Sequence, residues 1–386
     1  MKIGRTKFSV MTVGLCAGLA AAGGDTSTDQ DFDNDHGYML IGDPGNRPTE
    51  GDEIAFPLTF PIGDVEYEFR LAQLEMTVGE HAEFARAYAP IYFKNNPERS
   101  DAENAFSGWS LDVSRSRVEI LVLSENEPTT IGWEYAARYI NWLHHGKVSD
   151  EWAFETGVYD TSTFVCDEAP CSFPTGHPPE ARYWIPNQNE WVKAAHWDPE
   201  KDNGEGGYWI YPNRTNEALR PGLLPEDGGQ RNAGFDKDVY FPLDVGSFPN
   251  EPSPWGVLDM AGGEEEWNED LTSLPTHTNH RRGADGTSWT QTVYNHPYDR
   301  NALDYDQWNW FSAWPVRGAF GVRVARMVVD PADIDLSGKV DWFDVSAFLD
   351  RFLSDDPSVD FRRDGVHDAD DVWVFLGLLE AAQADE

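Results

Sequence analysis

The sequence predicts an irregular α+β domain followed by a small all-α module that carries paired calcium loops. Between residues 37 and 327, short apolar runs alternate with Pro, Gly, Asn and Asp clusters, and only a few segments show helical periodicity. Over residues 328–386 an acidic twelve-residue pattern occurs twice, and its two copies start 27 residues apart. The chain has 386 residues, of which 40% are hydrophobic, which suffices for two domains with separate cores.

The first 22 residues have the pattern of a secretory signal peptide, with an apolar run at 8–19 that is too short to span a bilayer. Three basic residues precede this run and a small-residue cleavage site follows it near Ala22. We therefore expect a secreted protein, extracellular or periplasmic, without a membrane span in the mature chain. Residues 23–36 are expected to form an acidic linker.

Three helices and two short strands are predicted within the main domain. Helical spacing indicates helices over 78–88 and 131–145, and Gly146 ends the second. A third begins at Asn187, which forms a capping box with Glu190. Strand candidates are residues 118–123 and 322–329. In an oxidising compartment Cys166 and Cys171 would most simply form a local disulfide.

The net charge of −39 makes nucleic acid an unfavourable partner, because phosphate backbones repel so acidic a surface. Carboxylates in excess instead suit divalent hard cations. No HExxH, GxSxG or Walker motif is present, so no catalytic residue is assigned.

The first acidic loop, residues 333–344, has the spacing of a calcium-binding loop. Gly338 permits the sharp turn, and Val340 is expected to tie the loop to the core. The alternative is a solvated acidic loop before a capped helix. The expected oxygen ligands are Asp333, Asp335, Ser337, the Lys339 carbonyl, Asp341 and Asp344.

The second loop, residues 360–371, matches less well. Arg362 stands where an oxygen ligand is expected, and His367 replaces an apolar residue. We expect weaker calcium binding, because the loop has lost one oxygen donor. The remaining ligands would be Asp360, Asp364, the Val366 carbonyl, Asp368 and Asp371.

Two such loops, followed by helix-like stretches at 345–352 and 372–379, resemble the dockerin family over residues 331–382. The resemblance implies a calcium-folded module that docks onto a cohesin-like receptor or a cell-surface scaffold. The family's Ser/Thr recognition pair is not evident in this sequence. Candidate docking residues are Ser346, Ala347, Trp373 and Val374.

The main domain resembles the sulfatase-modifying-factor, or formylglycine-generating-enzyme, family. The most specific segments are DMAGGEEEW at 259–267 and GVRVAR at 321–326. Other matching segments follow in the same order as in the family, at 69–85, 131–143, 181–196, 206–212 and 245–258. The resemblance covers residues 37–327 and implies a loop-rich α+β fold related to C-type lectins.

The same resemblance implies two structural calcium sites. The first maps onto Asn232, the Ala233 carbonyl, Asp238 and the Tyr240 carbonyl. The second maps onto Asp259, the Gly262 carbonyl, the Glu264 carbonyl and Glu266. The alternative for residues 264–266 is an exposed acidic turn.

Copper is not expected. The copper-dependent enzymes of the family have two cysteines in the segment that matches residues 281–326, and this chain has no cysteine there. The same segment would line the family's substrate groove. Its aromatic rings would then stack on a sugar or peptide. The alternative is that these rings belong to the core of the domain. The groove candidates are Arg282, Ser288, Trp289, His296, Trp308 and Trp310.

The sequence thus predicts a secreted, calcium-stabilised protein. Its main domain would bind a peptide or glycan without catalysing a reaction, and its C-terminal module would anchor it to a scaffold. One alternative is a formylglycine-generating oxidase that acts on sulfatase cysteines, or a related oxidoreductase. Another is a purely structural surface component.

Overall fold

The computed structural model describes most of the main domain and much of the C-terminal module. The predicted signal peptide and acidic linker lie outside the described residues, and so do Cys166 and Cys171. The described residues are 37–51, 53, 61–98, 111–121, 124–164, 174–220, 222, 225–231, 243–272, 281–285, 320–328, 332–335, 339–354, 356, 359, 361–362 and 366–382.

A four-stranded antiparallel sheet joins segments from both ends of the main domain. Strand β1 (Tyr38–Ile41) pairs with β2 (Phe69–Ala72), and β10 (Ala325–Arg326) lies between β2 and β5 (Tyr183–Trp184). The strand order is therefore β1-β2-β10-β5. The last strand of the domain occupies an inner position, and β5 forms one edge.

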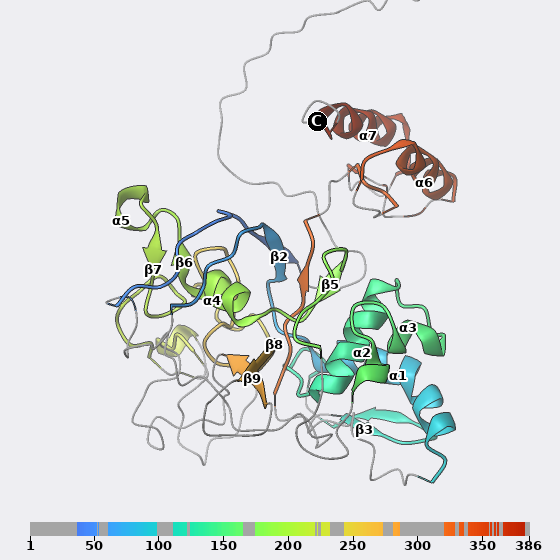
Figure 1. Ribbon diagram of the computed structural model, residues 1–386, viewed down its shortest axis with the longest axis horizontal. Coiled ribbons are helices and arrows are strands. Elements are labelled where there is room, and N and C mark those ends of the chain that lie inside the picture. The colour runs from blue at the N-terminus through green and yellow to red at the C-terminus, as the bar shows by residue number, and fades with distance from the viewer. Residues whose placement is uncertain are drawn as a thin grey trace, which may run out of the picture.

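Three helices pack together beside this sheet with the hairpin β3 (Leu111–Val113) and β4 (Val118–Ile120) (Figure 1). They are α1 (Val78–Asn95), α2 (Trp133–His144) and α3 (Glu151–Glu155). Aromatic contacts join them: Phe84 of α1 packs edge-on against Tyr139 of α2, and Trp142 of α2 stacks on Phe154 of α3. Both predicted helices are confirmed, but α1 continues past residue 88 through Pro90 to Asn95.

The other part of the domain is built around α4 (Gln188–His196) (Figure 1). Its predicted capping box is confirmed, since Asn187 Oδ1 accepts from the Glu190 N–H at 2.9 Å and Glu190 accepts from the Asn187 N–H at 2.7 Å. Short elements follow: β6 (Trp197–Asp198), α5 (Lys201–Gly204), β7 (Gly207–Tyr208), β8 (Glu266–Thr272) and β9 (Arg281–Asp285). Single 3₁₀ turns lie at Thr161–Thr163 and Pro225–Asp227.

The C-terminal helices α6 (Trp342–Leu353) and α7 (Ala369–Ala382) follow the main domain (Figure 1). They have a hydrophobic cluster of their own, separate from that of the main domain. The predicted helices at 345–352 and 372–379 are confirmed and are longer than expected. Phe348 and Phe375, which are 27 residues apart like the two loops, stack with ring centroids 4.2 Å apart. Val340 packs against the same cluster, as predicted.

The strands are shorter than the sequence suggests, since residues 118–120 and 325–326 alone form the two predicted ones. Helices and antiparallel strands joined by long loops agree with the predicted α+β class. Within the described residues, no helix combines the length and apolar character that crossing a membrane requires.

Candidate functional site

A cavity of about 580 Å³ opens at the β5 edge of the sheet. Segments far apart in the sequence meet there: the chain before β2, the loop before β5, the start of α4, the middle of β8 and the chain after β10. Its volume lies within the range of small-molecule sites. The lining residues are Tyr67, Glu68, Thr175, Gly176, His177, Pro179, Trp184, Asn187, Glu269, Asp270, Met327 and Val328.

Glu190, directly behind the wall of the cavity, holds several lining residues in place. Besides capping α4, its carboxylate accepts from Trp184 Nε1 at 3.0 Å and from the Tyr67 hydroxyl at 2.7 Å. Glu190 is completely buried, so these donors replace the water that an ionised carboxylate would otherwise require. The capping residue therefore also orients the two aromatic side chains.

His177 and Glu269 form a pair in the cavity wall. His177 Nδ1 lies 2.9 Å from Glu269 Oε2, and the imidazole stacks on Trp184 with ring centroids 4.3 Å apart. The other Glu269 oxygen accepts from the Tyr159 hydroxyl, which in turn accepts from the Ile185 N–H at 3.0 Å. The Glu269 side chain is 1% exposed, so its position is fixed by these partners.

The electrostatics of this wall follow from its burial. Burial raises the pKa of Glu190 to about 7, and the charge of His177 partly opposes the shift. For His177, burial acts to lower the pKa, but the hydrogen bond and negative charge of Glu269 outweigh it, so the pKa is raised. Glu269 therefore favours protonation of His177, and it offsets the positive charge that protonation adds to the wall.

The predicted second calcium site, at residues 259–266, includes side chains that are buried inside the main domain. Glu264, Glu265 and Glu266 are 8%, 3% and 2% exposed, so the alternative of an exposed acidic turn is wrong. Arg323 forms a buried ion pair with Glu266, with Nη2 2.8 Å from Oε1. The second Glu266 oxygen accepts from Trp191 Nε1 at 2.7 Å.

Two further carboxylates lie near this ion pair. Glu75 Oε1 accepts from the Glu264 N–H at 2.8 Å, whereas Glu75 Oε2 is buried without a hydrogen-bond partner. Burial, followed by the charge of Glu266, raises the pKa of Glu75 well above its ordinary value. Burial raises the pKa of Asp259 as well, while the Gly246 N–H that it accepts opposes the shift.

These residues fit the predicted calcium ion only in part. Asp259 and Glu266 belong to one buried acidic cluster, and the unpartnered Glu75 oxygen would suit a cation. Both oxygens of Glu266, however, already accept from Arg323 and Trp191. Coordination by Glu266 would require one of these donors to move, and calcium binding here stays a prediction.

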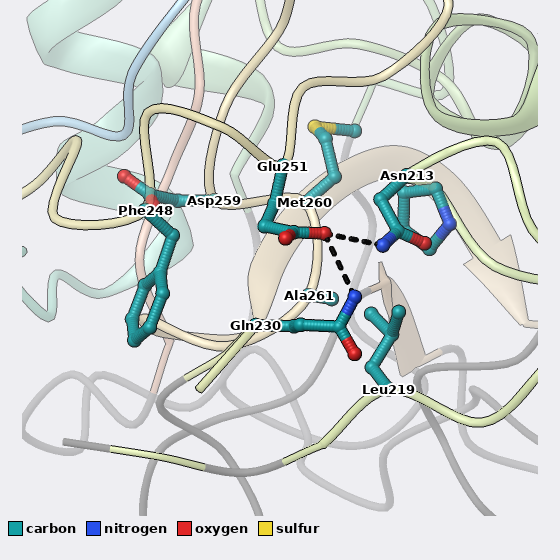
Figure 2. Close-up of a pocket in the computed structure, with 9 residues that line it drawn as sticks. Asn213, Leu219, Gln230, Phe248, Glu251, Asp259, Met260 and Ala261 are labelled. Atoms are coloured by element: carbon teal, nitrogen blue, oxygen red, sulfur yellow. Dashed lines mark hydrogen bonds between the residues drawn. The ribbon is translucent and has the colours of Figure 1, made fainter. Parts of the chain in front are cut away.

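A second, much smaller pocket of about 10 Å³ lies beside Asp259 and Met260 (Figure 2). Glu251 points into it and accepts from Asn213 and, at 3.2 Å, from Gln230 Nε2. This volume holds no more than about one water molecule. It is therefore a small polar void rather than a ligand site.

In the C-terminal module the structure brings Asp333, Asp335 and Asp344 together, with one oxygen of each within 4.8 Å of the others. Asp344 is buried and accepts from the N–H groups of Asp335 at 3.0 Å and Asp341 at 2.7 Å. Asp341, another predicted ligand, is exposed and caps α6 by accepting from the Phe343 N–H. Carboxylate oxygens are the donor type that calcium uses, and calcium binding by these three residues stays a prediction.

In the second loop, Asp371 makes the same pair of backbone hydrogen bonds as Asp344, but the third position of the loop has no carboxylate. Asp371 accepts from the N–H groups of Arg362 at 3.1 Å and Asp368 at 3.0 Å. The Arg362 guanidinium, in place of an oxygen ligand, pairs with Asp370. His367 donates through Nε2–H to the Asp356 carbonyl at 2.8 Å, and Phe352 packs against its ring.

Many predicted site residues lie outside the described part of the chain. Lys339 and Val366 are described, and the ligand role of their carbonyl oxygens stays a prediction. For Arg282 only the backbone, within β9, is described. The residues outside are Asn232, Ala233, Asp238, Tyr240, Ser288, Trp289, His296, Trp308, Trp310, Ser337, Asp360 and Asp364.

Sequence reasoning missed the cavity. Glu190 was recognised only as a cap, and His177 stands in a loop without a motif. One signal was available, because β8 follows Glu264 and Glu265 and itself contains Glu266 and Glu269, an unusually acidic run for a buried strand. Carboxylates in such a strand require partners, and His177 and Tyr159 are partners of Glu269.

Comparisons with known proteins identify the family of the main domain. The family model described as "Sulfatase-modifying factor enzyme 1-like domain" matches residues 35–328, which confirms the resemblance found in the sequence. Similar solved structures include CarF, with 12% identity, a TM-score of 0.43 and coverage of 76% of this chain and 98% of that chain. PvdO from Pseudomonas aeruginosa has 18% identity and a TM-score of 0.38, with 76% and 92% covered. No curated protein matches.

Proposed function

Because the chain belongs to the family of sulfatase-modifying factor enzyme 1-like domains over residues 35–328, we propose that it is a secreted binding protein built on this fold. The main domain holds a peptide or glycan ligand, and the C-terminal module attaches the protein to a partner. The observation that carries the proposal is the cavity at the β5 edge, which is lined by aromatic and hydrogen-bonding side chains.

The composition of residues 281–326 supports binding rather than copper-dependent oxidation. This segment contains no cysteine, and Cu(I) requires soft thiolate or thioether ligands of the kind that its relatives provide there. The proposed domain therefore uses its family fold as a scaffold for recognition. The oxidase that forms formylglycine on sulfatase cysteines is the second candidate, and family membership is what favours it.

The proposed docking role of the C-terminal module is supported by its exposed apolar side chains. Trp342, Leu353 and Trp373 are 78%, 80% and 70% exposed, although α6 and α7 also bury a core of their own. Trp342 and Leu353 are the two ends of α6 and Trp373 lies on α7, and large exposed apolar side chains support an interaction role for this module. We propose that a cohesin-like receptor or another scaffold covers them. Of the predicted docking residues, Ser346, Trp373 and Val374 are exposed, and Ala347 packs partly against the core.

Calcium is proposed as the ion that stabilises this module. Asp333, Asp335 and Asp344 supply hard oxygen donors around one position, and the glycine-containing loop would allow further carbonyl ligands. When bound, calcium would offset two of the three negative charges and hold the loop against α6. The chain's own residues prepare the loop, because Asp344 already accepts two of its N–H groups.

Metal analysis of the purified mature protein, paired with an oxygen-consumption assay on a cysteine-containing sulfatase peptide, tests the proposal. We expect bound calcium, no stoichiometric copper and no oxygen consumption above a blank. A Cys166→Ser/Cys171→Ser variant serves as the matched control for thiol chemistry. Stoichiometric copper together with turnover that this variant loses would replace the binding function with the oxidase.

A further inference from the structure

We infer that the ligand of the cavity at the β5 edge is a neutral glycan rather than a peptide. A sugar ring would stack on Tyr67, and one of its hydroxyl groups would form a hydrogen bond with His177 Nε2. This inference rests on the proposed binding function and names the ligand class that the proposal leaves open. It depends on how two lining side chains are held and on the backbone of β5.

The His177 imidazole is held so that one nitrogen is left for a ligand. Its Nδ1 lies 2.9 Å from Glu269 Oε2, and its ring stacks on Trp184 with centroids 4.3 Å apart. Glu269 is itself fixed, because its other oxygen accepts from the Tyr159 hydroxyl. Within the described residues, no hydrogen bond engages His177 Nε2, and the side chain is 15% exposed where it lines the cavity. The ring therefore presents Nε2 to a ligand.

A hydroxyl group suits His177 Nε2 in both protonation states of the imidazole. In the neutral ring, the Nδ1–H group donates to Glu269 and Nε2 accepts a hydrogen bond, whereas in the imidazolium Nε2 donates one. An alcohol can both donate and accept, while a peptide N–H only donates and a peptide carbonyl only accepts. His177 therefore favours a ligand that carries hydroxyl groups.

Tyr67 offers the cavity an aromatic ring rather than a hydroxyl group. Its hydroxyl donates to the buried Glu190 at 2.7 Å, and its ring packs edge-on against Phe69 with centroids 6.2 Å apart. The residue is nevertheless 42% exposed, and it lines the cavity. An aromatic side chain whose polar end is bound in this way offers its apolar ring to a ligand.

The two side chains belong to one supported wall. Trp184 connects them, because its ring stacks on His177 and its indole N–H donates to Glu190, the carboxylate that also binds the Tyr67 hydroxyl. A pyranose has an apolar C–H face and hydroxyl groups around its edge. Such a ring matches a wall that combines an exposed aromatic face with a fixed hydrogen-bonding nitrogen.

The backbone of β5 argues against an extended peptide as the ligand. A peptide that adds a strand to a sheet needs a row of unpaired N–H and C=O groups along the edge. Strand β5 has only two residues. The N–H groups on either side of it already have acceptors, since Arg182 donates to His144 Nδ1 at 3.2 Å and Ile185 donates to the Tyr159 hydroxyl at 3.0 Å. Recognition at this edge therefore falls to side chains.

Paired probes test the inference on the full-length protein. Saturation-transfer NMR titrations would compare three neutral trisaccharides, cellotriose, maltotriose and triacetylchitotriose, with the capped peptide Nα-acetyl-trialanine methylamide. We expect at least one trisaccharide to bind, with an affinity that added salt leaves unchanged because the ligand is neutral. The peptide should bind at least about tenfold more weakly. No binding of any trisaccharide, or equal or tighter binding of the peptide, would overturn the inference.

Variants of Tyr67 locate the stacking contact. Tyr67→Ala should weaken trisaccharide binding about tenfold, because it removes the ring. Tyr67→Phe keeps the ring and loses only the hydroxyl that positions it, so binding should weaken by no more than about threefold. Glu217→Gln, an exposed carboxylate outside the lining, is the control and should change nothing. Equal losses in the Ala and Phe variants would refute stacking on Tyr67.

A spectroscopic readout tests the contact with His177. With ¹⁵N-labelled histidine, a bound trisaccharide should shift the Nε2 resonance of His177, whereas His196, which is 1% exposed and does not line the cavity, should not respond. An unmoved His177 resonance with sugar bound would contradict the proposed position. Peptide binding that Tyr67→Ala weakens would reject the glycan inference while leaving the binding function intact, whereas copper-dependent turnover would reject the function itself.

Discussion

Glu190 joins the stability of a helix to the shape of the cavity, because one carboxylate accepts the cap N–H of Asn187, the indole of Trp184 and the hydroxyl of Tyr67. Its role as a cap was evident from the spacing of Asn187 and Glu190 in the sequence. Its contacts with Trp184 and Tyr67 depend on the sheet and were not evident. The local capping motif therefore predicted that Glu190 lies in the first turn of α4, but not that it supports the wall of the cavity.

Replacing Glu190 by Gln should remove a pH-dependent loss of stability. Burial raises the pKa of Glu190 from 4.5 to about 7, so the folded protein holds this proton more tightly than the unfolded chain. This contribution to the free energy of unfolding is fully present below pH 4.5 and is lost as the pH rises to about 7. Within this window the loss approaches about 1.4 kcal/mol per pH unit.

Urea unfolding of the wild type and Glu190→Gln across this pH range measures the effect. The wild type should lose stability relative to the variant as the pH rises. Glu217→Gln, at an exposed position, should follow the wild type throughout. Parallel curves for the wild type and Glu190→Gln would show that the Glu190 proton does not matter for folding.

The elements differ in how far the sequence determines them. Helices α2 and α4 were predicted because their periodicity and caps are local. Strand β5 has only two residues, so no alternation can mark it, and it forms because it pairs with the distant β10, which was predicted only as part of a longer strand. The cavity lies between such segments, and for this reason the sequence predicted the family and fold class but not His177 or Glu269.

Helix α1 offers a direct test of how much a capping box contributes to the stability of one element. Thr77 Oγ1 accepts from the Glu80 N–H at 3.2 Å, and the Glu80 carboxylate accepts from the Thr77 N–H at 2.8 Å. Thr77→Ala should lower the free energy of unfolding by about 1 kcal/mol, measured by urea denaturation. Ser116→Ala, at an exposed turn, is the control and should cost less than about 0.5 kcal/mol. Equal losses in both variants would mean that the cap contributes nothing.

At the scale of the whole molecule, the main domain and the C-terminal helices have separate hydrophobic clusters. A described link between them is the Arg182 guanidinium, which donates to the Asp335 carbonyl at 3.3 Å. One hydrogen bond at a partly buried position contributes only about 1 kcal/mol. The two parts are therefore expected to unfold in separate transitions.

Chelation should act on one of these transitions only. Without calcium, Asp333, Asp335 and Asp344 repel one another, so EDTA is expected to lower the melting temperature of the C-terminal module and leave the main domain's transition nearly unchanged. Circular dichroism melts of the full chain would show this. In the Asp344→Ala variant, the C-terminal module should melt at a lower temperature than in the wild type, with or without EDTA. In the Asp371→Ala variant, EDTA should still lower the melting temperature of the module, because the second loop has Arg362 in place of an oxygen ligand. A melt that EDTA does not alter would contradict calcium binding.

The inner position of β10 has a consequence for biosynthesis. Residues 325–326 fill the gap between β2 and β5, and the nearby Arg323 guanidinium donates to the Ala72 and Leu258 carbonyls. A chain still on the ribosome, with residues beyond 320 inside the exit tunnel, cannot complete the sheet. The domain would therefore stay unfolded until nearly all of it has emerged from the ribosome. This delay suits translocation in an extended state. A chain truncated before residue 323 would lack this central strand and would not be a smaller version of the domain.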